Sequence, residues 1–204
     1  GHVDPALHDV DDRKSAVRLA EVPVDVHRLL KARFGTDEVV ERYYNPGNLF
    51  REVHIVTTND DAPDAAALQK LVGDARLFLH NLPDSRRVFV RTLGWRPWLL
   101  GPWVEHAVRL AQTVRPQLIR CHGALLNAFA AAAIKRKLGV PYVVSMHINP
   151  DEDVRGRAGG GIKRIVTWMQ QGIERIGLIN ADLVMPVYQP IVAYLQRLGV
   201  TRYE

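Results

Sequence analysis

The sequence contains one cysteine, Cys121, among its 204 residues. A single thiol excludes an internal disulfide framework and indicates a reducing compartment. No run of 18 uninterrupted apolar residues occurs, so no transmembrane helix is predicted. The first residues do not have the charged-then-apolar pattern of a secretory signal. Cys121 lies in the apolar run LIRCHG, where we expect a small buried hydrophobe rather than a reactive thiol.

Two phosphate-binding signatures are also missing. Neither GxGxxG nor GxxxxGK[ST] occurs, which excludes a dinucleotide fingerprint and a P-loop. The net charge of +5 favours anionic partners such as phosphates, nucleotides, acidic lipids or nucleic acids. No aromatic–basic RNA motif and no helix-turn-helix pattern accompanies this charge, so we expect no nucleic-acid partner.

Apolar runs alternate with helical segments along most of the chain. The expected strands are residues 53–58, 86–93, 117–123, 142–148 and 181–188. Each is followed by a segment of helical pattern, the first of which runs from Asp64 to about His80. Strands that alternate with helices predict a doubly wound parallel α/β sheet, a Rossmann-like fold.

The start of the chain fits this plan least well. Residues 15–34 have apolar positions at mixed helical spacing, which predicts a helix that Pro23 breaks or kinks. We therefore expect residues 1–16 to be a tag remnant and flexible start, residues 17–200 to be the domain, and residues 201–204 to begin an interdomain linker. The first strand of the sheet then either lies upstream of this sequence or is arranged unusually.

Two histidines follow the same pattern in successive expected strands. His122 ends the run LIRCH and His147 ends the run YVVSMH, with a helical segment between them. Ligands of open parallel sheets bind outside the carboxyl ends of the strands, so both rings are expected to face one crevice. Imidazoles there donate hydrogen bonds to phosphate or sugar hydroxyls and exchange protons near neutral pH. The alternative is that each ring bonds only a local backbone group.

A metal site is not predicted. The two histidines together with Asp151, Glu152 and Asp153 supply zinc-ligand chemistry. However, the three acidic residues lie in an expected loop and lack the HExxH spacing of a helical zinc site, so a solvated loop surface is the expectation.

Four motifs in a fixed order resemble a known family. They are GNLFREVHIVTTND, CHG, AFAAAAIKRKLGVPYVVSMH and INADLVMPVYQPIVAYLQRLGV, and together they cover roughly residues 45–200. They resemble the N-terminal domain of GT-B glycosyltransferases, in the large retaining group of bacterial sugar transferases called family four. The sequence departs from the family in having no Gly-rich loop after a first strand, and Tyr188 occupies the family's serine position.

The resemblance implies the acceptor-binding half of a sugar transferase. Donor and acceptor would meet between this half and a second domain, which is absent from these 204 residues and would carry most nucleotide-sugar contacts. The expected partners are a nucleotide-sugar donor, a glycan or lipid-linked acceptor and that second domain, with no metal or cofactor. The resemblance further implies polysaccharide or glycolipid synthesis in the cytoplasm, with peripheral contact at the inner face of the membrane. We expect this half alone to be inactive. The alternative is a stand-alone binding module for a phosphorylated ligand.

The resemblance also implies roles for individual residues. His122, followed by Gly123, would lie beside the transferred sugar and the donor phosphate as the catalytic histidine, and His147 would line the acceptor side. Tyr188, Asn59 and Asp60 would reach the same edge of the sheet. Turn chemistry is the alternative explanation for the Asn59–Asp60 pair.

Two basic segments complete the candidate residues. The Gly-rich segment 155–164 precedes an expected helix and suggests either a mobile acceptor loop or a flexible surface loop. Its charged residues are Arg155, Arg157, Lys163 and Arg164. The segment 86–103 mixes tryptophan with arginine, which indicates membrane contact, glycan stacking or ordinary packing. Its candidate residues are Arg91, Trp95, Arg96 and Trp98.

Overall fold

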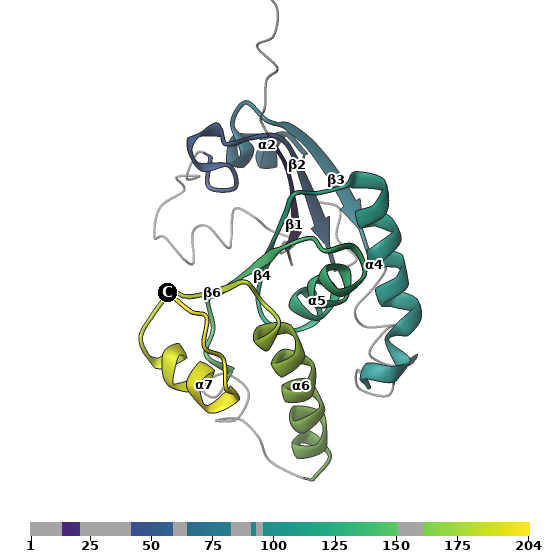
Figure 1. Ribbon diagram of the computed structural model, residues 1–204, viewed down its shortest axis with the longest axis vertical. Coiled ribbons are helices and arrows are strands. Elements are labelled where there is room, and N and C mark those ends of the chain that lie inside the picture. The colour runs from purple at the N-terminus through teal and green to yellow at the C-terminus, as the bar shows by residue number, and fades with distance from the viewer. Residues whose placement is uncertain (1–13, 21–41, 59–64, 83–90, 93–95, 151–160) are drawn as a thin grey trace, which may run out of the picture.

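The computed structural model describes residues 14–20, 42–58, 65–82, 91–92, 96–150 and 161–204, with residues 14–20, 67 and 161–167 described by their backbone alone. Six strands form one sheet in the order β3-β2-β1-β4-β5-β6, and every neighbouring pair is parallel (Figure 1). The strands are β1 (Lys14–Ala20), β2 (Phe50–Thr57), β3 (Arg76–Asn81), β4 (Leu118–His122), β5 (Tyr142–Met146) and β6 (Leu183–Pro186). Strand order runs from the central β1 through β2 to β3 at one edge, and then from β4 through β5 to β6 at the other. The predicted doubly wound fold is therefore confirmed.

Strand β1 corrects the expectation for the start of the chain. Residues 14–20 form a central strand between β2 and β4 rather than the beginning of a helix. Hydrogen bonding to a strand on each side outweighs the weak helical pattern of KSAVRLA. The first strand therefore lies within this sequence, and it begins before residue 17. The rest of the expected helix, residues 21–34, lies outside the described residues.

A second correction concerns the segment after β2. The helix expected to continue to His80 ends at Val72, and β3 follows it. Gly73 ends the helix because its φ of +62° is left-handed, and a Cβ on it would lie 2.8 Å from side-chain atoms of Arg42 and Asn48. The sequence Gly73-Asp74 was therefore a stop signal inside an otherwise helical pattern.

The strand expected at residues 86–93 is not found at the two residues of this range that the structure describes. Residue 91 is helical and residue 92 lies in a turn, while residues 86–90 lie outside the described part of the chain. The short helix η2 (Pro97–Leu99) then leads into α4 (Gly101–Val114). Another short helix, η1 (Pro46–Asn48), precedes β2.

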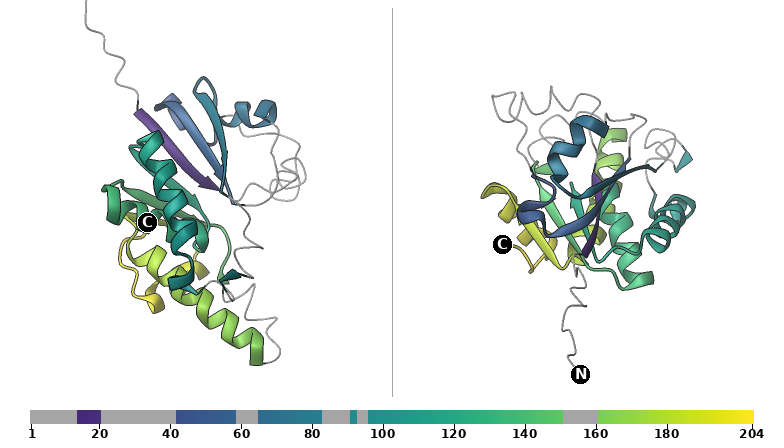
Figure 2. Two further views of the ribbon diagram at one scale, coloured as in Figure 1. Left: turned by 90° about the vertical axis from the view of Figure 1, so that its right-hand side faces the viewer. Right: turned by 90° about the horizontal axis from the view of Figure 1, so that it is seen from above.

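Helices cover both faces of the sheet (Figures 1 and 2). Helix α2 (Ala65–Val72) packs on one face against Val53 and Ile55 of β2. The other face carries the larger core, to which four helices contribute. These are α4, α5 (Leu126–Leu138), α6 (Gly161–Ile179) and α7 (Pro190–Leu198). None of the helices that the structure describes is long and apolar enough to cross a membrane.

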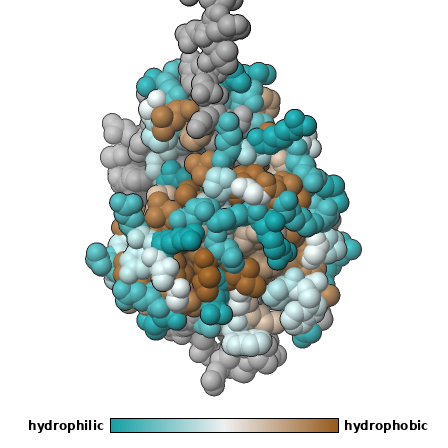
Figure 3. Space-filling view, in the orientation of Figure 1, coloured by the Kyte–Doolittle hydropathy of each residue, from teal (hydrophilic) through white to brown (hydrophobic). Residues whose placement is uncertain are grey.

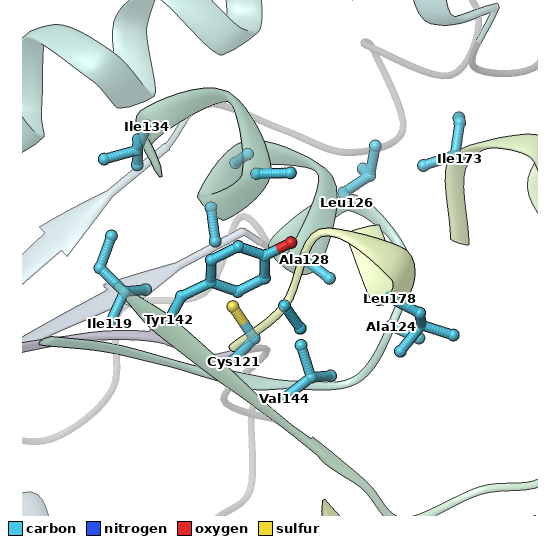
Figure 4. Packing of buried hydrophobic residues seen from close by; sticks show 14 of the residues in the cluster. Ile119, Cys121, Ala124, Leu126, Ala128, Ile134, Tyr142, Val144, Ile173 and Leu178 are labelled. Carbon is cyan, nitrogen blue, oxygen red and sulfur yellow. The ribbon is translucent and has the colours of Figure 1, made fainter. Parts of the chain in front are cut away.

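Small residues bring α5 and α6 close together. A Cβ placed on Gly177 would lie only 2.6 Å from the Cβ of Ala128, so the helices touch at this point. The buried Tyr142 extends from β5 beneath α5 and donates a hydrogen bond to the carbonyl of Gly177 (Figure 4). The small alanine side chains of α5 thus allow the helix to pack closely between the sheet and α6.

The later elements agree with the sequence analysis. Helix α5 ends at Gly139, whose φ of +73° gives the expected left-handed cap. Beyond α7 the chain returns to the sheet, where Tyr203 bridges to Val184 of β6. Residues 201–204, which were expected to begin a linker, therefore include one that contacts the edge strand.

Candidate functional site

His122 is the last residue of β4, and His147 follows β5 directly. Ile119 and Cys121 point into the core beneath α5, so the alternating residues Arg120 and His122 lie on the opposite face. The same alternation places Ser145 and His147 on that face, because Val144 and Met146 are in the core. Both histidines therefore lie on one face of the sheet and at its carboxyl end.

The two imidazole rings are stacked. Their centroids are 5.5 Å apart and their planes differ by 10°, and both residues are half-buried. The expectation that the two rings lie together at one end of the sheet is confirmed in its geometry.

Two tyrosines that are distant in sequence pack against this pair. The ring centroids of Tyr44 and Tyr43 lie 5.6 Å and 6.1 Å from that of His122. The guanidinium of Arg120 lies 5.8 Å from the centroid of the Tyr43 ring, and its Nε donates a 3.1 Å hydrogen bond to Ser145 Oγ. Within the part of the chain that the structure describes, no carboxylate lies within ion-pair distance of Arg120. The cluster therefore combines a fixed positive charge with two titratable rings.

Asn45 fixes the backbone that carries the two tyrosines. Its side chain is fully buried, and its Nδ2 donates to the carbonyls of Phe50 (2.9 Å) and Val72 (3.2 Å). Its Oδ1 accepts a hydrogen bond from the Phe50 amide at 2.9 Å. The backbone amide of Tyr44 also donates to the carbonyl of Leu71, at the end of α2. These bonds anchor the segment that precedes β2 to the carboxyl end of α2.

The turn after β4 holds the backbone of His122. Gly123 has a φ of +95°, which non-glycine residues rarely adopt, and its amide donates to the carbonyl of Ser145. The side-chain amide of Asn127 donates to the His122 carbonyl at 2.9 Å. Gly123 therefore has a structural reason to be glycine, whether or not it touches a ligand.

Tyr188 joins the histidine end of β5 to the segment after β6. The hydroxyl of Tyr188 accepts a 3.0 Å hydrogen bond from the backbone amide of Asn149, two residues beyond His147. The amide of Val187 donates to the carbonyl of Met146. The structure therefore brings Tyr188 to the same end of the sheet as the histidine pair.

The remaining candidates are not brought to this site by the described contacts. Arg91 is exposed, and Arg96 lies over the ring of Trp98, which lines a separate pocket beside α6. Lys163 and Arg164 lie in the first turn of α6, where the backbone alone is described. The candidates outside the described residues are Asn59, Asp60, Trp95, Arg155 and Arg157, together with the acidic residues 151–153.

Cys121 is not a nucleophile in this fold. It is completely buried, and burial raises the pKa of its thiol far above the ordinary value. The expectation of a small buried hydrophobe is confirmed.

Sequence reasoning missed four residues of the cluster. Arg120 and Ser145 lie two residues before His122 and His147, so the alternation of side chains along a strand was enough to find them. Tyr43 and Tyr44 offered no such signal, because only the folded chain brings them to a histidine nearly 80 residues later.

The cluster is suited to binding an anion. Arg120 provides charge and the imidazoles provide N–H donors. Among the described residues, no three His, Cys, Asp or Glu side chains gather as a metal site would require. Two imidazoles are fewer protein ligands than zinc takes in its usual sites.

Comparison with known proteins adds a family to this geometry. No curated protein is similar enough in sequence to be matched. Among solved structures, UDP-N-acetylglucosamine 2-epimerase from Rickettsia bellii is similar at a TM-score of 0.52 and 12% identity, covering 94% of this chain and 44% of the epimerase. The epimerase from Methanocaldococcus jannaschii gives 0.48 at 13% identity (94% and 44% covered). UGT73P12 of Glycyrrhiza uralensis, a complex with glycyrrhetinic acid 3-O-monoglucuronide, gives 0.49 at 12% identity (93% and 48%).

The chain thus spans less than half the length of each of these three solved structures. The likeness to the Rickettsia bellii epimerase supports a Rossmann-like α/β fold of the GT-B type. Residues 47–204, most of the chain, match the family described as glycosyl transferase 4-like domain. The chain belongs to this family and is a GT-B glycosyltransferase-like N-terminal domain.

Proposed function

We propose that this chain is the acceptor-side half of an enzyme that moves a sugar from a nucleotide-sugar donor to a glycan or lipid-linked acceptor. The observation that carries the proposal is the stacked pair His122 and His147, with Arg120 beside it, at the carboxyl end of a doubly wound sheet. Membership of the glycosyl transferase 4-like family supports the reaction class. A second half of the enzyme would supply most contacts to the nucleotide.

In this proposal His122 acts on the leaving group. As the bond between the sugar and the diphosphate breaks, negative charge grows on the leaving oxygen, and a ring N–H of His122 stabilises it by a hydrogen bond. Arg120 adds positive potential behind the ring. Gly123 and Asn127 hold the His122 backbone, so the ring needs little reorganisation during the reaction.

His147 and Tyr188 then face the acceptor. The stacked arrangement leaves His147 to orient an acceptor hydroxyl, and Tyr188 fixes the backbone just beyond it. Arg155, Arg157, Lys163 and Arg164 would attract a phosphorylated or lipid-diphosphate acceptor. The proposed transfer retains the anomeric configuration of a hexose and needs no metal or cofactor.

The proposed setting is bacterial polysaccharide or glycolipid synthesis, in the cytoplasm at the inner face of the membrane. The 204-residue chain alone should transfer no sugar, because the donor would be held between two halves. A second candidate is a stand-alone module that binds a phosphorylated ligand without chemistry. The charge of Arg120, which no carboxylate among the described residues neutralises, favours it.

A thermal-shift screen of the full-length protein against nucleotide sugars tests the proposal. A ligand that binds only the native state raises the melting temperature. We expect one nucleotide sugar to do so, and His122→Gln to reduce the shift while His106→Gln, an exposed change on α4, leaves it intact. Shifts by phosphates alone, without any by nucleotide sugars, favour the binding module.

A further inference from the structure

A pocket lies between η2, α6 and the end of α7. Its volume is about 300 Å³, at the small end of the range for small-molecule sites. Its lining includes Trp98, Trp168, Met169, Gly172 and Leu198, and neither His122 nor His147 contributes to it. On the face seen in Figures 1 and 3, hydrophobic residues form several separate patches among hydrophilic ones.

Two tryptophans beside this pocket are turned to the solvent. Trp98 and Trp168 are each 72% exposed, although tryptophan is highly buried on average. Trp98 comes from η2 and Trp168 from the second turn of α6, so the two indoles reach the pocket from separate elements. Neither indole is needed to fill the core, which leaves flat apolar surfaces available to a ligand.

Gly172 keeps part of the pocket wall open. It lies within α6, where glycine lowers helix stability relative to alanine. A Cβ on Gly172 would meet no atom within 4 Å, in contrast to Gly177 one and a half turns later. Packing within the described part of the fold therefore does not explain this glycine, and the space beside it is open to a ligand.

The polar groups of the pocket are few and include a positive charge. Arg175 lines it one turn after Gly172, and Gln171 adds an amide. Among the residues that the structure describes, no carboxylate lies within ion-pair distance of Arg175. Arg96 does not line the pocket, but its guanidinium lies 5.8 Å from the centroid of the Trp98 ring. Guanidinium groups bind hydroxyl and carboxylate oxygens with several N–H donors at once.

We propose that this pocket binds a hexopyranose ring of a glycan. The apolar face of the ring would stack on an indole, and its hydroxyl or carboxylate groups would bond to Arg175 and Gln171. The concave shape favours a ring over a membrane surface, which would require side chains that project into lipid. The proposal rests on the proposed function only in naming the acceptor as the source of the sugar.

Intrinsic tryptophan fluorescence of the 204-residue chain tests this site. The probes are the methyl glycosides of glucose, galactose, mannose, N-acetylglucosamine and glucuronic acid. We expect at least one to change the emission saturably, and Trp168→Ala to weaken its binding about tenfold. Gly172→Leu should block binding while the chain stays folded, since its side chain meets open space. Arg175→Gln should weaken binding of the glucuronide more than that of the neutral sugars.

Leu49→Ala is the matched control, because Leu49 is 63% exposed and precedes β2, outside the pocket. The proposal is overturned if no glycoside binds, or if Trp168→Ala and Gly172→Leu both bind as wild type does. The proposal is also overturned if the chain binds no glycoside but sediments with vesicles containing phosphatidylglycerol, and Trp168→Ala abolishes that sedimentation. The surface would then bind a membrane. If no glycoside binds but a nucleotide sugar still raises the melting temperature, this site alone is rejected. If a glycoside binds but no nucleotide sugar raises the melting temperature, the proposed function alone is rejected.

Discussion

The imidazole rings of His122 and His147 lie parallel, with 5.5 Å between their centroids, although 24 residues and a whole helix separate them in sequence. Parallel pairing of β4 with β5 brings their carboxyl ends together, and the alternation of side chains puts both rings on one face. The two rings are therefore placed side by side at the carboxyl end of the sheet.

Removing the side chain of Asn45 should destabilise the domain. Asn45→Ala leaves the amide and carbonyl of Phe50 and the carbonyl of Val72 without a side-chain partner in a buried setting. We expect a loss of about 2–3 kcal/mol in the free energy of unfolding, measured by urea denaturation. Asn180→Ala, which removes an exposed hydrogen bond to Ile176, should change it by less than about 0.5 kcal/mol. Equal losses in both variants would contradict the anchoring role of Asn45.

Two glycines of α6 should respond oppositely to the same substitution. Gly177→Ala places a methyl group 2.6 Å from the Cβ of Ala128 and should destabilise the domain by about 1–3 kcal/mol. Gly172→Ala meets open space and should stabilise the helix by up to about 1 kcal/mol. Melting temperatures of the two variants make the comparison, and a shift of the same sign in both would contradict the described packing.

Stability should fall as the pH drops below about 6.5, the ordinary pKa of histidine. Nδ1 of His54 lies 2.9 Å from Nε2 of His80 on the neighbouring strand. Burial lowers the pKa of both, and the charge of His80 lowers that of His54 further, against the opposing effect of Glu52. Below 6.5 the unfolded chain binds protons that the folded pair resists, so stability present above this pH is lost as the pH falls toward the lowered values.

Urea denaturation between pH 8 and pH 5 measures this effect. His54→Gln should flatten the dependence in that range, whereas His106→Gln, on the exposed side of α4, should leave it unchanged. A flat profile for the wild-type chain between pH 8 and pH 5 would contradict the assignment of this effect to His54 and His80.

Asp182 affects stability in a lower pH range. Burial opposes its ionisation, but the hydrogen bond from Lys135 prevails and lowers its pKa below the ordinary 3.8.

The later half of the fold was predictable because its local signals agree. Residues 118–122, 142–146 and 183–186 are apolar runs between helices with clear ends, and Gly139 stops α5 as expected. The start of the chain was not, because β1 includes Lys14 and Arg18 and its strand conformation depends on pairing with β2 and β4. A segment with mixed periodicity takes the conformation that its neighbours in the folded chain favour.

The candidate site, like the fold, was predictable only in part. The strand ends specify His122 and His147, since the carboxyl ends of parallel strands meet at one edge. The tyrosines at 43 and 44 depend on a segment held by Asn45 and α2, a tertiary arrangement with no counterpart in local sequence. The pocket beside α6 likewise joins Trp98 to Trp168 across 70 residues.

The most direct test of the account is the turnover rate of the His122→Gln variant of the full-length protein, with the donor identified by the thermal-shift screen. If His122 stabilises the leaving diphosphate, kcat should fall about 100- to 1,000-fold with little change in melting temperature. His106→Gln should keep the wild-type rate. A His122→Gln variant within about threefold of wild type would contradict the catalytic role assigned to the histidine pair.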